Sequence, residues 1–214
     1  MKLYYALGAC SLSPHIVARE AGIELELERV DLRTNPHRTE TGADFTEINP
    51  KGYVPALRLD DGQLLTEGAA IVQYLADLVP ASGLAPPAGT LERYRLQEWL
   101  TFVGTELHKM FSPWLFHPEY GEQAAEVARA KIAQRFALLD AHLAGHPHLL
   151  GPGFTVADAY AFTIVGCARL MRIDLAAFAH LQRYMDRIAA RPKVREAMQA
   201  EDLRTVGRPA TSEQ

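Results

Sequence analysis

Residues 1–14 read MKLYYALGACSLSP, a stretch with a strand signal, a cysteine and a helix start. The run Met1–Tyr5 predicts a short apolar strand, and Ser13 followed by Pro14 predicts a helix N-cap and the first residue of that helix. Cys10 lies between the strand and the helix. The dipole and the free N–H groups of a helix N-terminus favour thiolate over thiol. The sequence therefore predicts thiol chemistry at Cys10.

Alternative roles stay open for Cys10 and for its neighbour Ser11, a second candidate catalytic residue. Most free cysteines behave as small buried apolar residues, and the position of Cys10 alone does not exclude that role. Ser11 can donate a hydrogen bond to the sulfur, or it can accept one from an N–H group at the helix end, which is the commoner role of such a serine.

The rest of the first 80 residues alternates between strand and helix patterns. The first helix ends at Gly22, and Asp61 with Gly62 predicts a hairpin turn. The further elements are strands at residues 24–30, 54–59 and 64–66 and a helix at residues 68–78. This order is β-α-β and, after a connection that the pattern does not define, β-β-α. It predicts a small mixed sheet with helices packed on it.

A stretch rich in proline and glycine, residues 80–89, precedes a region in which almost every apolar residue has a helical period. The expected helices lie at residues 91–116, 123–145, 155–171, 176–190 and 192–200. Pro113 and Pro118 bend or end the first of them. The sequence thus predicts an α/β domain at residues 1–80, a linker at 81–89, an all-helical domain at 90–206 and a frayed tail at 207–214.

The composition of the 214 residues, with a formal net charge of −4 and 48% hydrophobic residues, is that of an ordinary globular protein. Because no basic stripe is present, we expect no nucleic-acid partner. No apolar run approaches the roughly 20 residues that cross a bilayer, and the first residues do not resemble a signal peptide. The two cysteines, Cys10 and Cys167, do not suggest a disulfide framework, so we expect a cytoplasmic protein. No spacing of cysteines or histidines is typical of a metal site.

Residues 49–57 read NPKGYVPAL and carry a second candidate site. Pro55 removes a hydrogen-bond donor from the strand and holds Val54 extended. If the Val54–Pro55 bond is cis, the main-chain groups of Val54 face outward and can pair with an extended peptide-like ligand. The alternative is a simple proline on an edge strand, and these residues by themselves favour it.

Three further positions have both a functional and a structural interpretation. Glu67 and Gly68 begin a helix whose open N–H groups can bind a carboxylate, but Glu67 can equally balance the helix dipole. His108 has the pKa range needed for proton transfer at neutral pH, but it can also be a surface or packing histidine. Thr155 and Asp158 form a capping box, for which we prefer the structural role.

Taken together, these segments resemble the bacterial cytosolic glutathione S-transferases, and in particular their cysteine-containing beta class. The resemblance rests on four stretches in the same order: MKLYYALGACSLSPHIVAREAG, INPKGYVPALRLDDGQLLTEGAAIVQYLAD, EWLTFVGTELHK and FTVADAYAF. It implies a thioredoxin-like N-terminal domain, an all-helical C-terminal domain and a homodimer, with glutathione as co-substrate between the domains.

The resemblance also implies roles for individual residues. Cys10 would face the sulfur of glutathione, with His108 near the same thiol. Val54 would pair with the cysteinyl main chain, and Glu67 with Gly68 would hold the γ-glutamyl end. The full set implied or proposed for the glutathione site comes from both halves of the chain: Cys10, Asn35, Val54, Pro55, Glu67, Gly68, Thr101, Thr105, Glu106 and His108.

Departures from the family pattern bear on the affinity for glutathione. Asn35 stands where a lysine often meets the glycyl carboxylate, so that Arg33 or Arg38 would have to replace it. Gly68 replaces a common serine and keeps only the main-chain N–H, and Thr101 replaces a common asparagine.

The sequence therefore predicts a transferase that adds the glutathione thiolate to small hydrophobic electrophiles, with peroxidase or thiol-exchange side activity. Trp114 and Phe116 are candidate apolar walls for the electrophile. Cys167 stands where a tryptophan is expected and can be a packing residue or a redox participant. Two other functions stay open: a glutathione-dependent thiol reductase or lyase that uses Cys10, and a non-enzymatic interaction protein with the same fold.

Overall fold

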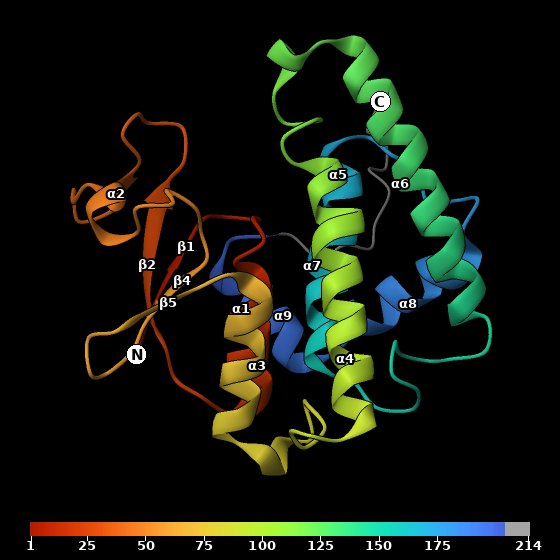
Figure 1. Ribbon diagram of the computed structural model, residues 1–214, viewed down its shortest axis with the longest axis horizontal. Coiled ribbons are helices and arrows are strands. Elements are labelled where there is room, and N and C mark those ends of the chain that lie inside the picture. The colour runs from red at the N-terminus through yellow and green to blue at the C-terminus, as the bar shows by residue number, and fades with distance from the viewer. Residues whose placement is uncertain (204–214) are drawn as a thin grey trace, which may run out of the picture.

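The computed structural model describes residues 1–203 and has a sheet in its N-terminal part and helices throughout its C-terminal part (Figure 1). The strands are β1 (Lys2–Tyr5), β2 (Glu26–Asp31), β3 (Arg38–Thr39), β4 (Ala56–Arg58) and β5 (Leu64–Thr66). They form a five-stranded sheet in the order β3-β2-β1-β4-β5. Strands β1 and β2 are parallel, and the other neighbours are antiparallel. The mixed sheet predicted from the sequence is therefore confirmed.

Strand β1 lies at the centre of the sheet and buries both of its faces, because successive side chains point to opposite sides. Leu3 belongs to the main hydrophobic core, whereas Tyr4 belongs to a smaller cluster with Phe45 of α2 (Phe45–Ile48), at 5.7 Å between ring centroids. Helices α1 (Leu12–Ala21) and α3 (Gly68–Leu78) lie on the Leu3 side, between the sheet and the helical part (Figure 1).

Helix α1 begins earlier than the sequence predicts. Its N-cap position is Ser11, and Ser13 lies inside the first turn with its hydroxyl donating to the Cys10 carbonyl at 2.8 Å. The prediction of Ser13 as N-cap is therefore wrong, because the N–H groups of Leu12 and Ser13 already donate to the carbonyls of Ala9 and Cys10 and the helical turn begins before Ser13. The predicted end at Gly22 is confirmed, and its φ of 72° is a left-handed conformation that glycine adopts without strain.

The C-terminal part is helical from Leu91 onwards in the region that the structure describes. Its elements are α4 (Leu91–Phe102), the π-helical segment η2 (Val103–His108), α5 (Lys109–Phe111), the short turn η3 (Pro118–Tyr120), α6 (Glu122–Leu143), α7 (Val156–Leu170), α8 (Ala179–Ala189) and α9 (Pro192–Ala200). The predicted helix at 91–116 thus ends at Phe111, two residues before Pro113. Helix α7 is almost wholly buried and packs against α1, α3 and α4 (Figure 1).

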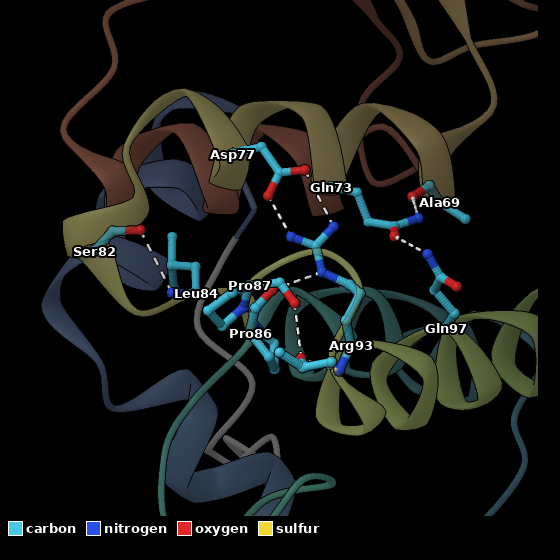
Figure 2. Close-up of polar contacts among 10 residues, drawn as sticks. Ala69, Gln73, Asp77, Ser82, Leu84, Pro86, Pro87, Arg93 and Gln97 are labelled. Carbon is cyan, nitrogen blue, oxygen red and sulfur yellow. Dashed lines mark hydrogen bonds and ion pairs between the residues drawn. The ribbon is translucent and has the colours of Figure 1, made fainter.

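Arg93 of α4 connects the two parts of the chain (Figure 2). Its guanidinium donates to the Pro86 carbonyl at 2.7 Å, in the segment that follows the short turn η1 (Pro80–Ser82), and to both carboxylate oxygens of Asp77 on α3. Figure 2 also shows Gln97 of α4 donating to the Gln73 side chain of α3, at 3.2 Å. These contacts connect α3 and the segment after η1 to α4.

Two absences concern residues 1–203 only. None of the helices there has both the length and the apolar character needed to cross a membrane. The same residues contain no group of three or more acidic, histidine or cysteine side chains that could hold a metal ion. The tail predicted to fray, residues 207–214, lies outside the described part of the chain.

Candidate active site

Cys10 lies in the turn between β1 and α1, and its sulfur faces the segment that precedes β4. The Cys10 Sγ donates to the Val54 carbonyl at 3.2 Å, across 44 positions of sequence. The Val54–Pro55 bond is cis, which is the arrangement that the sequence offered as a condition for a peptide-binding edge. Within residues 1–203 the Val54 N–H makes no hydrogen bond, whereas its carbonyl is occupied by the Cys10 thiol. The N–H is the group left for an extended ligand.

The environment of the Cys10 sulfur favours the thiol. Burial raises the pKa of Cys10 to about 12, and a negative charge on Cys167 would raise it further. The main-chain N–H groups of Cys10 and Ser11 and the charge of Lys109 lower this pKa, but by less. The expectation of a thiolate favoured by the helix N-terminus is therefore wrong for this state of the protein. The loss of water around the sulfur outweighs the helix dipole.

Ser11 supports the turn and does not touch the sulfur with its side chain. Its hydroxyl donates to the Ala6 carbonyl at 3.2 Å and accepts from the Ala6 N–H at 3.1 Å, and the residue is fully buried. Neither of the two roles considered from the sequence is correct for this hydroxyl. The side chain closes the loop between Ala6 and Cys10, and only the main-chain N–H of Ser11 acts on the thiol.

Glu67 and Gly68 begin α3 beside this turn. Glu67 has a φ of 70°, and its carboxylate accepts from Lys51 Nζ at 2.6 Å. The sequence reasoning missed Lys51, although this lysine lies in the quoted segment 49–57. A Cβ on Gly68 would lie 3.7 Å from the Pro55 ring and 3.9 Å from the Ser13 hydroxyl, which are ordinary contact distances. The space at this position would therefore accept the serine that the family often carries.

His108 is the last residue of η2 and comes from the helical part. Its Nδ1 lies 2.9 Å from the hydroxyl of Tyr160 on α7. Burial and the charge of Lys109 lower the pKa of His108 to about 4, against the weaker opposite effect of Glu67. His108 is therefore neutral at neutral pH. Burial and the charges of Cys10 and Glu67 raise the pKa of Tyr160 well above its usual range, so these groups lie near one another.

Lys109 reaches across from α5 to the N-terminal part, where its Nζ lies 6.0 Å from the centroid of the Tyr53 ring. The sequence reasoning missed both Lys109 and Tyr160. Lys109 directly follows the histidine that the motif singled out. Tyr160 lies in the quoted stretch FTVADAYAF, but that stretch was interpreted only as a capping box followed by an apolar helix. The site is thus built from both parts of the chain.

None of the hydrogen bonds or ion pairs among residues 1–203 joins the other predicted binding residues to Cys10. Glu106 pairs with Arg135 of α6 at 2.9 Å, and Thr105 donates to the Thr101 carbonyl at 2.9 Å. Asn35 is exposed in the loop after β2. Of the two arginines considered as its substitutes, Arg33 is held by Asp31 and Arg38 donates to the Gly42 carbonyl.

Cys167 and the candidate apolar walls also have defined places. Cys167 is buried in α7, with its sulfur 3.8 Å from the Thr163 carbonyl, and both cysteines are free thiols. Trp114 and Phe116 are about two-fifths exposed in the loop after α5, where Trp114 packs on Tyr120. Two cavities, of about 500 and 620 Å³, lie along α4 and the linker and include none of the residues around Cys10.

Comparison with known proteins identifies the family. The model of the glutathione S-transferase N-terminal domain matches residues 8–78, and that of the C-terminal domain matches residues 102–192. Glutathione S-transferase GstA of Escherichia coli O157:H7 is 45% identical over 204 residues, which cover 95% of this chain and 100% of the relative.

Solved structures agree with this result. The beta class glutathione S-transferase of Sphingomonas chungbukensis is 46% identical with a TM-score of 0.90, and the match covers 95% of this chain and 100% of that one. A Sphingomonad glutathione S-transferase complexed with glutathione is 47% identical, with the same TM-score and coverage.

The fold and the site thus define a two-domain protein, thioredoxin-like in its first part and all-helical in its second, with a thiol at their junction. The chain belongs to the glutathione S-transferase family. The fold class, the resemblance to the bacterial beta class and the transferase activity expected from the sequence are confirmed.

Proposed function

We propose that this transferase adds the thiolate of glutathione to small hydrophobic electrophiles, and that glutathione lies beside Cys10. The observation that carries the proposal is the 3.2 Å contact between the Cys10 sulfur and the carbonyl of Val54. It puts a thiol next to a main-chain edge with a free N–H donor, which suits a short extended peptide that carries its own sulfur.

The groups around Cys10 suit the cysteinyl main chain of glutathione and both charged groups of its γ-glutamyl residue. The Val54 N–H would donate to the cysteinyl carbonyl of glutathione. Glu67 would accept from the γ-glutamyl ammonium group, with Lys51 orienting its carboxylate from the other side. The N–H of Gly68, at the start of α3, would donate to the γ-glutamyl carboxylate, because helix N-termini favour anions.

The nucleophile in this proposal is the sulfur of glutathione and not that of Cys10. A pKa of about 12 leaves the Cys10 sulfur almost wholly protonated at neutral pH, and a thiol is a poor nucleophile. The glutathione thiolate uses its electron pair to form a carbon–sulfur bond with the electrophile, and the group displaced leaves with the electrons of its own bond. The single proton of the Cys10 thiol is donated to the Val54 carbonyl, so Cys10 would lie beside the attacking sulfur without being its hydrogen-bond donor.

We further propose that the protein is a cytoplasmic homodimer. In each chain, residues 81–89 would link the two domains. The electrophile would lie against Trp114 and Phe116, whose partly exposed rings offer apolar surface after α5. The proposed roles of Asn35, Thr101, Thr105 and Glu106 rest on the family resemblance alone. Sedimentation equilibrium tests the dimer, which should have twice the 23.7 kDa mass of the chain. A single species with the mass of one chain would contradict it.

Calorimetry with glutathione and turnover of an aryl halide test the transferase proposal. Cys10→Ala should still bind glutathione and keep conjugation within about ten-fold of wild type, while any disulfide exchange with glutathione is lost. Cys167→Ala, which removes the other thiol, serves as the matched control and should retain both activities. A Cys10→Ala variant that folds but has lost conjugation would show that Cys10 itself is the nucleophile. A wild-type protein that neither binds glutathione nor turns over any aryl halide would defeat the proposal.

A further inference from the structure

The pair formed by His108 and Tyr160 has a geometry that the proposed function does not yet use. The Tyr160 hydroxyl lies 2.9 Å from Nδ1 of His108, and the two rings are nearly perpendicular, at 89°. Tyr160 is almost fully buried in α7, so its hydroxyl has a fixed place. A Cβ on Gly104, one turn before His108, would lie 3.6 Å from this hydroxyl. This is an ordinary contact distance, so η2 packs directly against the tyrosine hydroxyl.

The direction of this hydrogen bond follows from the charge states of its two partners. The raised pKa of Tyr160 keeps the phenol protonated, and the lowered pKa of His108 keeps the imidazole neutral. A phenol O–H is a better donor than an imidazole N–H, and the bare nitrogen of a neutral imidazole is a better acceptor than a phenol oxygen. The Tyr160 hydroxyl therefore donates to Nδ1, and the single ring proton of His108 resides on Nε2.

The other ring nitrogen is open to a ligand. Nε2 of His108 makes no hydrogen bond within residues 1–203, and in that region no wholly buried side-chain nitrogen or oxygen lacks a partner. It follows that Nε2 reaches the solvent. The charged or titratable groups that face the pair are Lys109 on α5, Glu67 at the start of α3 and Cys10 before α1. These are the groups that surround the proposed place of the glutathione sulfur.

We infer that Tyr160 is a positioning residue that holds His108 with its proton on Nε2, so that His108 donates a hydrogen bond to the glutathione sulfur. His108 then stabilises the thiolate and does not remove its proton. The thiol proton passes to water, and His108 keeps the same proton before and after the reaction. This inference rests on the proposed function, because it assigns a role at the same site.

Nitrogen-15 NMR of the ligand-free protein tests the tautomer directly. The wild-type spectrum should show His108 protonated at Nε2 and bare at Nδ1. Tyr160→Phe should remove the hydrogen bond and shift the Nδ1 resonance. Tyr184→Phe is the matched control, because it also removes a buried hydroxyl but one that contacts Asp158. It should leave the His108 resonances unchanged. A wild-type His108 with its proton on Nδ1 would overturn the inference, and this result requires no binding of glutathione.

Kinetic measurements test whether His108 donates a hydrogen bond to the glutathione thiolate or removes the proton of the thiol. Tyr160→Phe should lower kcat/KM for an aryl halide by about 3- to 10-fold near pH 6.5, with a smaller difference at pH 9, because the thiolate is less stabilised. His108→Gln keeps an N–H donor that cannot accept a proton, so it should retain several-fold more activity than His108→Ala. Equal losses in these two variants, or an unchanged pH profile in Tyr160→Phe, would overturn the inference. A wild-type protein that does not bind glutathione would instead remove the proposed function and leave the tautomer assignment standing.

Discussion

At pH 7, Cys10 should react with iodoacetamide roughly 10³-fold more slowly in the folded protein than in the denatured protein. An unfolded cysteine has a pKa near 8.5, so about 3% of it is thiolate at pH 7. Burial raises the pKa of folded Cys10 to about 12. That value leaves a thiolate fraction on the order of 10⁻⁵. Because the thiolate is the species that reacts, the rates should differ by roughly the ratio of these fractions.

The assay uses Cys167→Ser, so that Cys10 is the single thiol in the chain. Mass spectrometry of the intact protein follows alkylation between pH 7 and pH 11, with folded and urea-denatured samples side by side. The denatured rate should level off above pH 9, and the folded rate should still rise at pH 11. A thermal melt of Cys167→Ser close to that of wild type shows that the folded sample is native.

A folded protein that reaches half of its maximum rate at or below pH 8.5 would refute the reasoning. That result would mean that the helix N-terminus and Lys109 outweigh the removal of water from the sulfur. The Cys10 sulfur would then be ionised near neutral pH, and it would regain the role of nucleophile that the sequence suggested.

Three further predictions concern stability. Asp158→Ala should lower the free energy of unfolding by about 3–5 kcal/mol in urea titrations, because a buried carboxylate that accepts four hydrogen bonds is lost. Arg93→Ala should cost about 1–3 kcal/mol, because Arg93 is buried and holds Asp77 (Figure 2), whereas Arg95→Ala at an exposed ion pair should cost less than about 0.5 kcal/mol. Wild type should lose stability relative to His108→Gln as the pH falls from about 6.5 to about 4. In this range the unfolded histidine takes up a proton and the folded one does not, so acid favours the unfolded chain.

Each of these predictions has a result that contradicts it. Wild-type stability in Asp158→Ala would mean that water replaces the carboxylate in the capping box. Equal losses in Arg93→Ala and Arg95→Ala would mean that the contacts between α3 and α4 add nothing beyond a surface ion pair. Parallel pH curves for wild type and His108→Gln would mean that folding does not lower the pKa of His108.

Most elements of the fold follow from local patterns in the sequence. The helical period of residues 68–78 and 192–200 matches α3 and α9 in their exact bounds, and Asp61 with Gly62 forms the expected hairpin between β4 and β5. The start of α1 does not follow in the same way. The Ser13–Pro14 pair is a strong local signal for a helix start, yet the helix begins at Leu12 with Ser11 as the N-cap position. The Ser11 hydroxyl does not cap the helix, because it bonds to the main chain of Ala6.

Short motifs are enough to single out Cys10, Val54 and Glu67 as candidates, and their roles at the site stay predictions. Lys51 and Tyr160 were missed because their importance arises from partners 16 and 52 positions away. Such contacts depend on how α3 and α7 pack in the folded chain, and no window of neighbouring residues contains that information.

By itself, the order of residues determined the elements, their succession and the place of a thiol ahead of a helix, because these depend on side chains a few positions apart. Only the folded structure decided that the Cys10 thiol keeps its proton and that the His108 imidazole is neutral. Burial in the folded chain removes water from both groups, and the energy of a charge depends on the water it has lost.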